Sequence, residues 1–184
     1  MILLTSPARA QAPDREGFGV GARLYGASLS IDIDGYTESA SGGGAELRVG
    51  YRFNPTVSVF LSAGGATLQP EGENLDAYRF GTADLGAQFN LLPSRALNPY
   101  LRAALTGQVA AFDIPGTSDN LEARGGGITL GGGLLYAVSP KLSLDLSLDA
   151  TGGRFTELVF DGDTTSNFDE IDSGIGRLGF GLVF

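Results

Sequence analysis

The stretch "KLSLDLSLDAT" (residues 141–151) alternates strictly between apolar and polar side chains. Leucine occupies every second position from Leu142 to Leu148, and serine or aspartate stands between the leucines. Successive side chains of a β-strand point to opposite faces, so a period of two predicts a strand with one apolar and one polar face. Asp145 and Asp149 lie on the polar face of this predicted strand.

The same alternation recurs in seven further segments, which are bounded by clusters of Asn, Pro, Gly, Asp and Ser. The eight predicted strands cover residues 18–33, 45–53, 56–68, 79–92, 100–112, 126–138, 141–151 and 173–184. In the first of them the apolar positions change parity between Leu24 and Leu29, which predicts a β-bulge or an extension beyond the main sheet. Helical periodicity is not found after Pro13, so the chain is expected to be all-β.

The connections between these strands alternate in length. Short turns are predicted at residues 54–55, 93–99 and 139–140, and long loops at about 34–43, 69–77, 113–125 and 155–172. This alternation is typical of an antiparallel up-and-down meander whose short turns all lie at one end. Eight strands in this order can close into a barrel that leaves no strand edge unpaired.

Composition excludes several classes of function. The 184 residues carry a formal net charge of -9, which argues against nucleic acid as a partner because phosphate binding needs clustered Lys and Arg. Cysteine and histidine are both absent, so disulfides, thiolate metal sites, His-based acid-base chemistry and most zinc sites are excluded. A chain of this length suffices for one domain.

The first residues differ in kind from the rest. The segment "MILLTSPARAQAP" (residues 1–13) combines a short apolar run with A-x-A sites at residues 8–10 and 10–12. Because a basic start and a full apolar segment are missing, residues 1–12 are interpreted as a signal-peptide remnant, cleaved after Ala10, or as a disordered tail. The single barrel domain is expected to span residues 17–184.

Two kinds of barrel fit the alternation, and they turn the apolar face in opposite directions. A soluble lipocalin-like barrel points it inward around a ligand, whereas a transmembrane barrel points it toward lipid. The polar face here holds mostly Gly, Ala, Ser, Thr, Gln and Asn, and Lys141 is the single lysine of the chain. A solvated surface would be richer in Lys and Glu, so the sequence favours a transmembrane barrel with a crowded polar interior. Aromatic residues fall toward the short-turn ends, where an interfacial girdle would lie: Tyr51, Phe53, Phe89, Phe180 and Phe184.

Five features carry a resemblance to a known family. They are the export remnant, the opening "GFGVGARLYG" (residues 17–26), the signature "NPYLRAALTG" (residues 98–107), the alternation of short turns and long loops, and the terminal apolar stripe that ends at Phe184. With these features the chain resembles the small eight-stranded outer-membrane barrels of Gram-negative bacteria, the OmpA-like and OmpX-like β-barrel family. The resemblance covers residues 17–184 and implies export to the outer membrane and the cell surface. Outer-membrane lipid and lipopolysaccharide would then be partners of a monomeric barrel. The resemblance also implies that the barrel-assembly machinery reads the last strand, with Leu178, Phe180, Leu182 and Phe184 as its signal.

Charged side chains on the polar faces are predicted to meet inside the barrel. The expected interior network comprises Arg23, Glu46, Arg48, Arg52, Asp84, Arg102, Asp145, Asp149 and Arg177. Five cations and four anions nearly balance, as a closed space of low dielectric requires. Counted from the short turns, one level is expected to hold Arg23, Glu46, Arg48, Asp84, Asp149 and Arg177. The network is predicted to be a salt-bridged plug, serving either as a structural core or as a gate that exchanges partners.

The long loops hold most of the acidic residues and would make one rim strongly negative. Within them "DIDG" (residues 32–35) and "DGDTTS" (residues 161–166) allow weak binding of a divalent cation, but neither continues as an EF-hand. The glycine-rich stretches "GFGVGA" and "GGGITLGGG" continue as strands and do not lead into a helix, so nucleotide binding is rejected. No cofactor is predicted.

The leading hypothesis for function is a non-enzymatic outer-membrane barrel with a structural or surface role. The alternatives are a narrow porin or channel for small solutes or hydrophobic compounds and, second, a soluble lipocalin-like ligand-binding barrel. A lipid A acylase, a deacylase or an outer-membrane protease is disfavoured, because barrels of those types rely on a catalytic histidine and this chain has none.

Overall fold

The computed structural model describes residues 16–33, 36–71, 76–113, 120–160, 163–165 and 171–184. Within them the chain forms nine β-strands: β1 (Gly17–Ile33), β2 (Tyr36–Arg52), β3 (Val57–Pro70), β4 (Tyr78–Asn90), β5 (Leu97–Asp113), β6 (Asn120–Ser139), β7 (Leu142–Phe160), β8 (Asp163–Thr165) and β9 (Ile171–Val183). The described part of the chain contains no helix long and apolar enough to cross a membrane.

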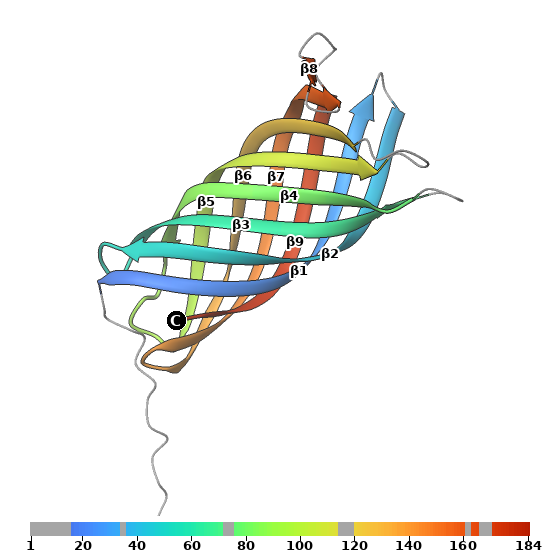
Figure 1. Ribbon diagram of the computed structural model, residues 1–184. Coiled ribbons are helices and arrows are strands. Elements are labelled where there is room, and N and C mark those ends of the chain that lie inside the picture. Colours follow the sequence, from blue (N-terminus) through green and yellow to red (C-terminus); the bar gives the residue numbers. More distant parts are fainter. Residues whose placement is uncertain (1–15, 34–35, 72–75, 114–119, 161–162, 166–170) are drawn as a thin grey trace, which may run out of the picture.

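Eight of these strands close into an antiparallel barrel (Figure 1). The order around the ring is β6, β5, β4, β3, β2, β1, β9 and β7, and pairing of β7 with β6 closes it. The short strand β8 lies outside the ring and pairs with the end of β7. The predicted all-β, eight-stranded, up-and-down barrel is therefore confirmed.

Strand β7 shows why the sequence forms this wall. From Leu142 to Asp149 its leucines point outward and its serines and aspartates point inward: Leu148 is 64% exposed, whereas Asp149 is 1% exposed. The other strands repeat the pattern, with exposed Val49, Leu101 and Leu105 among them. A barrel with an apolar outside and a polar inside is built for lipid, and it is the reverse of a soluble ligand-binding barrel. The predicted orientation is confirmed.

Aromatic side chains collect near the short-turn end of the outer surface. The ring of Tyr51 lies between those of Phe18 and Phe53, with centroids 5.1 Å apart in each edge-to-face pair. Phe89 and Phe184 are also exposed near this end. Phe180 precedes Phe184 by four residues and therefore lies further from the short turns. Aromatic rings of this kind suit the boundary between hydrocarbon and headgroups.

The predicted bulge in the first strand is wrong, and so is the alternative of an extension beyond the main sheet, because β1 stays paired with β9 as far as Asp32. Strand β1 pairs with β2 in continuous register from Gly17 to Ile33. Alternation is unbroken, but Tyr25, Ala27 and Leu29 point into the barrel, where they are buried. The parity of apolar residues changes because the interior itself turns from polar to apolar along the strand. Register shifts occur instead between β6 and β7.

The predicted long loops are also too long. β2 already begins at Tyr36, β6 at Asn120, and β7 continues to Phe160. In these outer ends many apolar residues face inward and many outward residues are small or polar, so the pattern of a lipid-facing strand is lost although the pairing continues. The predicted signal-peptide remnant or tail at residues 1–12 lies outside the described residues.

A labelling experiment checks the orientation, because the chain has no native cysteine. In Leu148→Cys we expect reaction with a membrane-permeant, environment-sensitive maleimide and strong quenching of that dye by brominated lipids. In the neighbouring Ser147→Cys we expect little reaction while the barrel is folded, since Ser147 is buried. Equal labelling at both positions, or quenching only at residue 147, would contradict the assignment of faces.

Candidate functional site

Six charged side chains meet in the middle of the barrel and form what we call the central ion cluster: Arg23, Glu46, Asp84, Arg102, Asp149 and Arg177. All six are buried. They come from six different strands, β1, β2, β4, β5, β7 and β9, each at an inward position of the alternating pattern. Three cations face three anions, so the cluster is formally neutral.

Asp149 binds two arginines of the cluster. Arg23 lies 2.8 Å from Asp149 through Nη1 and 2.5 Å from Glu46 through Nη2. Arg102 donates from both Nε and Nη2 to the two oxygens of Asp149. Gly131 pairs with Asp149 across the sheet, and a Cβ there would collide with the carboxylate. A glycine at that position therefore leaves the space that Asp149 occupies.

Arg177 connects opposite walls of the barrel. Its Nη2 lies 3.1 Å from Asp84, and its Nη1 lies 3.7 Å from Glu46. Arg177 belongs to β9 and Asp84 to β4, and these strands are four places apart in either direction around the eight-membered ring. The pair therefore spans the lumen at its widest.

Hydroxyl groups complete the cluster. Arg23 also donates to Ser147 (2.7 Å), and Arg177 to Thr82 (3.2 Å) and Thr129 (3.3 Å). Thr106 donates to Asp84 over 2.7 Å. Buried charge is tolerated only when it is paired and hydrogen-bonded, and these contacts meet that condition. Such an arrangement fills and rigidifies the lumen, with its carboxylates engaged by arginines.

The remaining predicted interior residues lie nearer the short turns. Asp145 accepts a hydrogen bond of 2.7 Å from the Tyr100 hydroxyl. Arg48 donates to Gln88 (3.0 Å) and stacks over the Phe60 ring, 3.8 Å from its centroid. The expectation that Arg48 shares the level of the central ion cluster is wrong, since Arg102 takes that place. The cause is the stagger between tilted strands, which residue counting does not capture.

An apolar layer fills the interior between the central ion cluster and the long-loop end. We call it the outer apolar core: Tyr25, Ala27, Leu29, Ala40, Ala66, Leu68, Tyr78, Phe80, Ala110, Ala123, Phe155 and Ile175. The alternation of apolar and polar residues does not predict this layer, because it assigns every apolar position to the lipid-facing surface. The signal that could have found it is the change of parity in the first strand.

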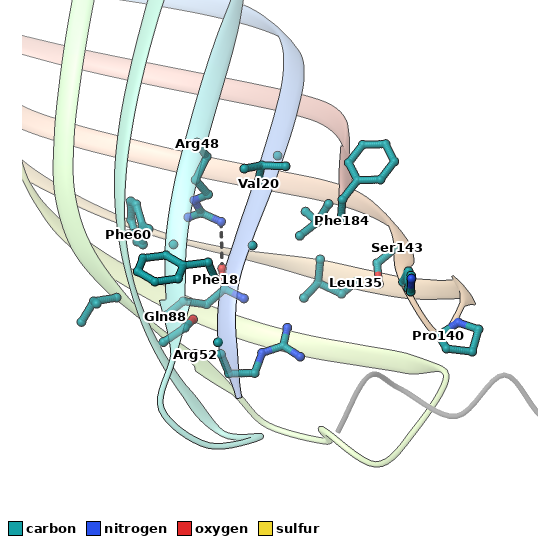
Figure 2. A pocket seen from close by; sticks show the side chains of 18 residues that line it. Phe18, Val20, Arg48, Arg52, Phe60, Gln88, Leu135, Pro140, Ser143 and Phe184 are labelled. Carbon is teal, nitrogen blue, oxygen red and sulfur yellow. Dashed lines mark hydrogen bonds between the residues drawn. The ribbon is translucent and has the colours of Figure 1, made fainter. Parts of the chain in front are cut away.

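On the other side of the cluster, the short-turn end contains a cavity of about 380 Å³, which we call the short-turn cavity (Figure 2). Arg52, the ninth predicted interior residue, is half-buried and lines it. Arg48, Lys141, Phe60 and Leu135 are among the other lining residues.

The predicted assembly-signal residues all lie on the outer face at the end of the chain. Leu178, Phe180, Leu182 and Phe184 are exposed. Phe184 also exchanges two backbone hydrogen bonds with Val20 of β1, over 2.8 and 3.2 Å.

The predicted cation sites cannot be placed, because residues 34–35, 161–162 and 166 lie outside the described residues. Among the residues that the structure does describe, no group of three or more acidic side chains is arranged to hold a metal ion.

Comparison with known proteins agrees with this architecture. The family model of the outer membrane protein beta-barrel domain matches residues 1–184. The chain is similar to Neisserial surface protein A (NspA), at 20% identity and a TM-score of 0.67, covering 91% of this chain and 96% of that chain. It is similar to OprG from Pseudomonas aeruginosa, at 16% identity and a TM-score of 0.60, covering 94% and 98%. It is also similar to Ail, the attachment invasion locus protein of Yersinia pestis, at 20% identity and a TM-score of 0.54, covering 92% of this chain and 100% of that chain. A comparison with curated proteins gave no match.

Proposed function

This chain belongs to the outer membrane protein beta-barrel domain family and is an outer-membrane protein. We propose that it is a non-enzymatic barrel with a closed interior. Its role is structural or at the surface, with the long-loop end presented outside the cell. The single observation that supports this proposal most is the central ion cluster, in which Arg177 and Asp84 join opposite walls of the lumen.

The cluster closes the barrel because its charges are already paired. An ion or sugar passing through would have to break buried ion pairs and leave their partners uncompensated, which costs several kcal/mol per pair, on the order of 3–5. The outer apolar core adds a second barrier, since a hydrated solute loses its water there. Two barriers in series favour a seal over a narrow porin or channel.

We propose a non-enzymatic barrel because the chain lacks two common catalytic residue types and the carboxylates of the central ion cluster are paired with arginines. It has no histidine or cysteine to act as a base or nucleophile. The carboxylates of the central ion cluster are bound to arginines, and the outer apolar core separates them from the long-loop end. Conductance recording in planar bilayers tests the closed interior, and the wild-type barrel is expected to give no stable unitary steps.

Lipid surrounds the barrel, and we include lipopolysaccharide among its partners. Exposed arginines stand near the long-loop end of three strands: Arg79 on β4, Arg124 on β6 and Arg154 on β7. Arg124 and Arg154 are paired at the surface with Glu122 and Asp172, and phosphate would compete for them. Guanidinium groups are suited to phosphate, which lipopolysaccharide carries. We also propose that the barrel is a monomer. Weak divalent-cation binding at the acidic loops remains a prediction.

We further propose that the barrel-assembly machinery reads the terminal stripe, with Phe184 as its last residue. In Phe184→Ala we expect a strong fall in outer-membrane yield in cells but nearly normal refolding from urea into detergent. The ring is 59% exposed at the end of a strand, so its burial contributes only about 1 to 2 kcal/mol.

Phe89→Ala is the matched control, because that ring is 48% exposed near the short-turn end of β4, outside the terminal strand. It should refold like Phe184→Ala and keep a normal yield in cells. Equal yield losses in both variants would reduce Phe184 to an ordinary packing residue.

A further inference from the structure

The short-turn cavity holds an arginine that lacks partners. One terminal nitrogen of Arg48, Nη1, donates to Gln88, and the guanidinium plane stacks on Phe60 (Figure 2). Its Nε and Nη2 are buried and have no hydrogen-bond partner in the described part of the chain. In the central ion cluster, by comparison, Arg23 and Arg177 each leave only Nε without a partner. Arg48 therefore keeps one whole edge of its fork unused.

That edge has a defined chemical preference. The Nε–H and Nη2–H groups are parallel donors in the plane of the guanidinium, and they match the two oxygens of a carboxylate or phosphate. Leaving two charged donors buried without acceptors is unfavourable, so an acceptor that reaches them gains more than it would in water.

The surroundings of this edge are positive. Arg52 and Lys141 line the same cavity, and none of its described lining residues has an acidic side chain. Two interior carboxylates near Arg48 already have other partners: Asp145 accepts a hydrogen bond from Tyr100, and Glu46 accepts one from Arg23. An anion is therefore favoured in the cavity and a cation is repelled.

One side of the cavity is apolar and reaches the membrane side of the barrel. Phe60, Leu135 and Val183 line it, as do the first residues of β1 and Phe184. The side chains of Phe18, Val20 and Phe184 are exposed on the lipid-facing surface beside it. A volume of about 380 Å³ falls in the range of pockets that hold a small organic ligand.

From these features we propose that the short-turn cavity binds a fatty acid. A turn of the Arg48 guanidinium toward the cavity brings its buried Nε and Nη2 to the carboxylate, which accepts a hydrogen bond from each. The acyl chain runs along Phe60 and Leu135 toward the wall between β1 and β9. This site adds to the closed-barrel function and does not depend on it, because it lies on the short-turn side of the central ion cluster.

The test is a titration of the full chain in maltoside detergent with octanoate labelled with carbon-13 at the carboxyl carbon, followed by NMR. We expect a single saturable site with a shifted carboxyl resonance. Octanol lacks the anion and acetate lacks the chain, so each should bind at least about tenfold more weakly. Inorganic phosphate separates a fatty-acid site from a general anion site, and phosphate binding as tight as that of octanoate would overturn the proposal.

Variants identify the anchoring group. Arg48→Gln should weaken octanoate binding at least about tenfold, and Arg48→Lys, which keeps the charge but loses the fork, should also weaken it several-fold. Arg124→Gln, an exposed arginine outside the cavity, should bind as the wild type does. A heat-dependent shift in electrophoresis verifies that each barrel is folded, and Arg48→Lys remains informative if Arg48→Gln does not fold. Octanoate binding that is non-saturable, or unchanged in the folded Arg48 variants, would overturn the proposal.

Discussion

Asp149→Asn is expected to lower the free energy of unfolding by about 3–5 kcal/mol, the usual cost of removing one partner from a buried ion pair. Asp149 is bound to two arginines, Arg23 and Arg102, and is 1% exposed. Asparagine has nearly the same shape, so the loss comes from charge and not from a cavity. Arg102 would then face a neutral amide in the buried interior, and Arg23 would keep only Glu46 as a charged partner.

Urea unfolding of the purified barrel in detergent measures this loss. Asp172→Asn is the matched control, because Asp172 also pairs with an arginine, Arg154 at 2.9 Å, but its side chain is 69% exposed. An exposed pair contributes only about 0–1 kcal/mol. Similar small losses for both substitutions would show that the central ion cluster is not a tightly coupled interior network.

Phe155→Ala is expected to cost a similar amount, about 3–5 kcal/mol, as for other large-to-small changes in a packed core. Phe155 lies on β7, is 1% exposed and packs in the outer apolar core. The substitution removes apolar contacts and leaves a void that the surrounding barrel wall cannot collapse to fill. The same unfolding experiment measures it.

Phe160→Ala provides the comparison, since Phe160 is on the same strand but is 49% exposed. It should cost less, about 1 to 2 kcal/mol. If Phe155→Ala were as mild as Phe160→Ala, the interior at the long-loop end would be loosely filled, and the second barrier of the closed interior would be lost.

The strand count and the orientation of the wall could be predicted from the sequence because lipid imposes a simple rule. Every residue that faces hydrocarbon is apolar, so stretches such as Leu142–Leu148 show their period directly. The rule holds only along the part of each strand where the outer surface of the barrel contacts lipid. Beyond that level Leu29 and Phe155 face inward, and a pattern that assigns apolar residues outward loses the strands there.

The partners of the interior charges were less predictable than their orientation. Alternation alone indicates that Arg48 and Arg102 both point inward, and both do. Which of them reaches Asp149 depends on the tilt and stagger of eight strands, a property of the closed barrel that no single strand contains. The short-turn cavity depends in the same way on how the wall closes between β1 and β9.

Single-channel recording of the purified wild-type barrel in planar lipid bilayers tests the closed interior most directly, with insertion verified independently by protease protection in proteoliposomes. The structure predicts a flat baseline without stable unitary steps, and the same for Arg177→Ala, because the outer apolar core still closes the lumen when the pair with Asp84 is lost. A stable unitary conductance in the wild type that rises in Arg177→Ala would contradict the closed interior and show that Arg177 stands in a conducting path.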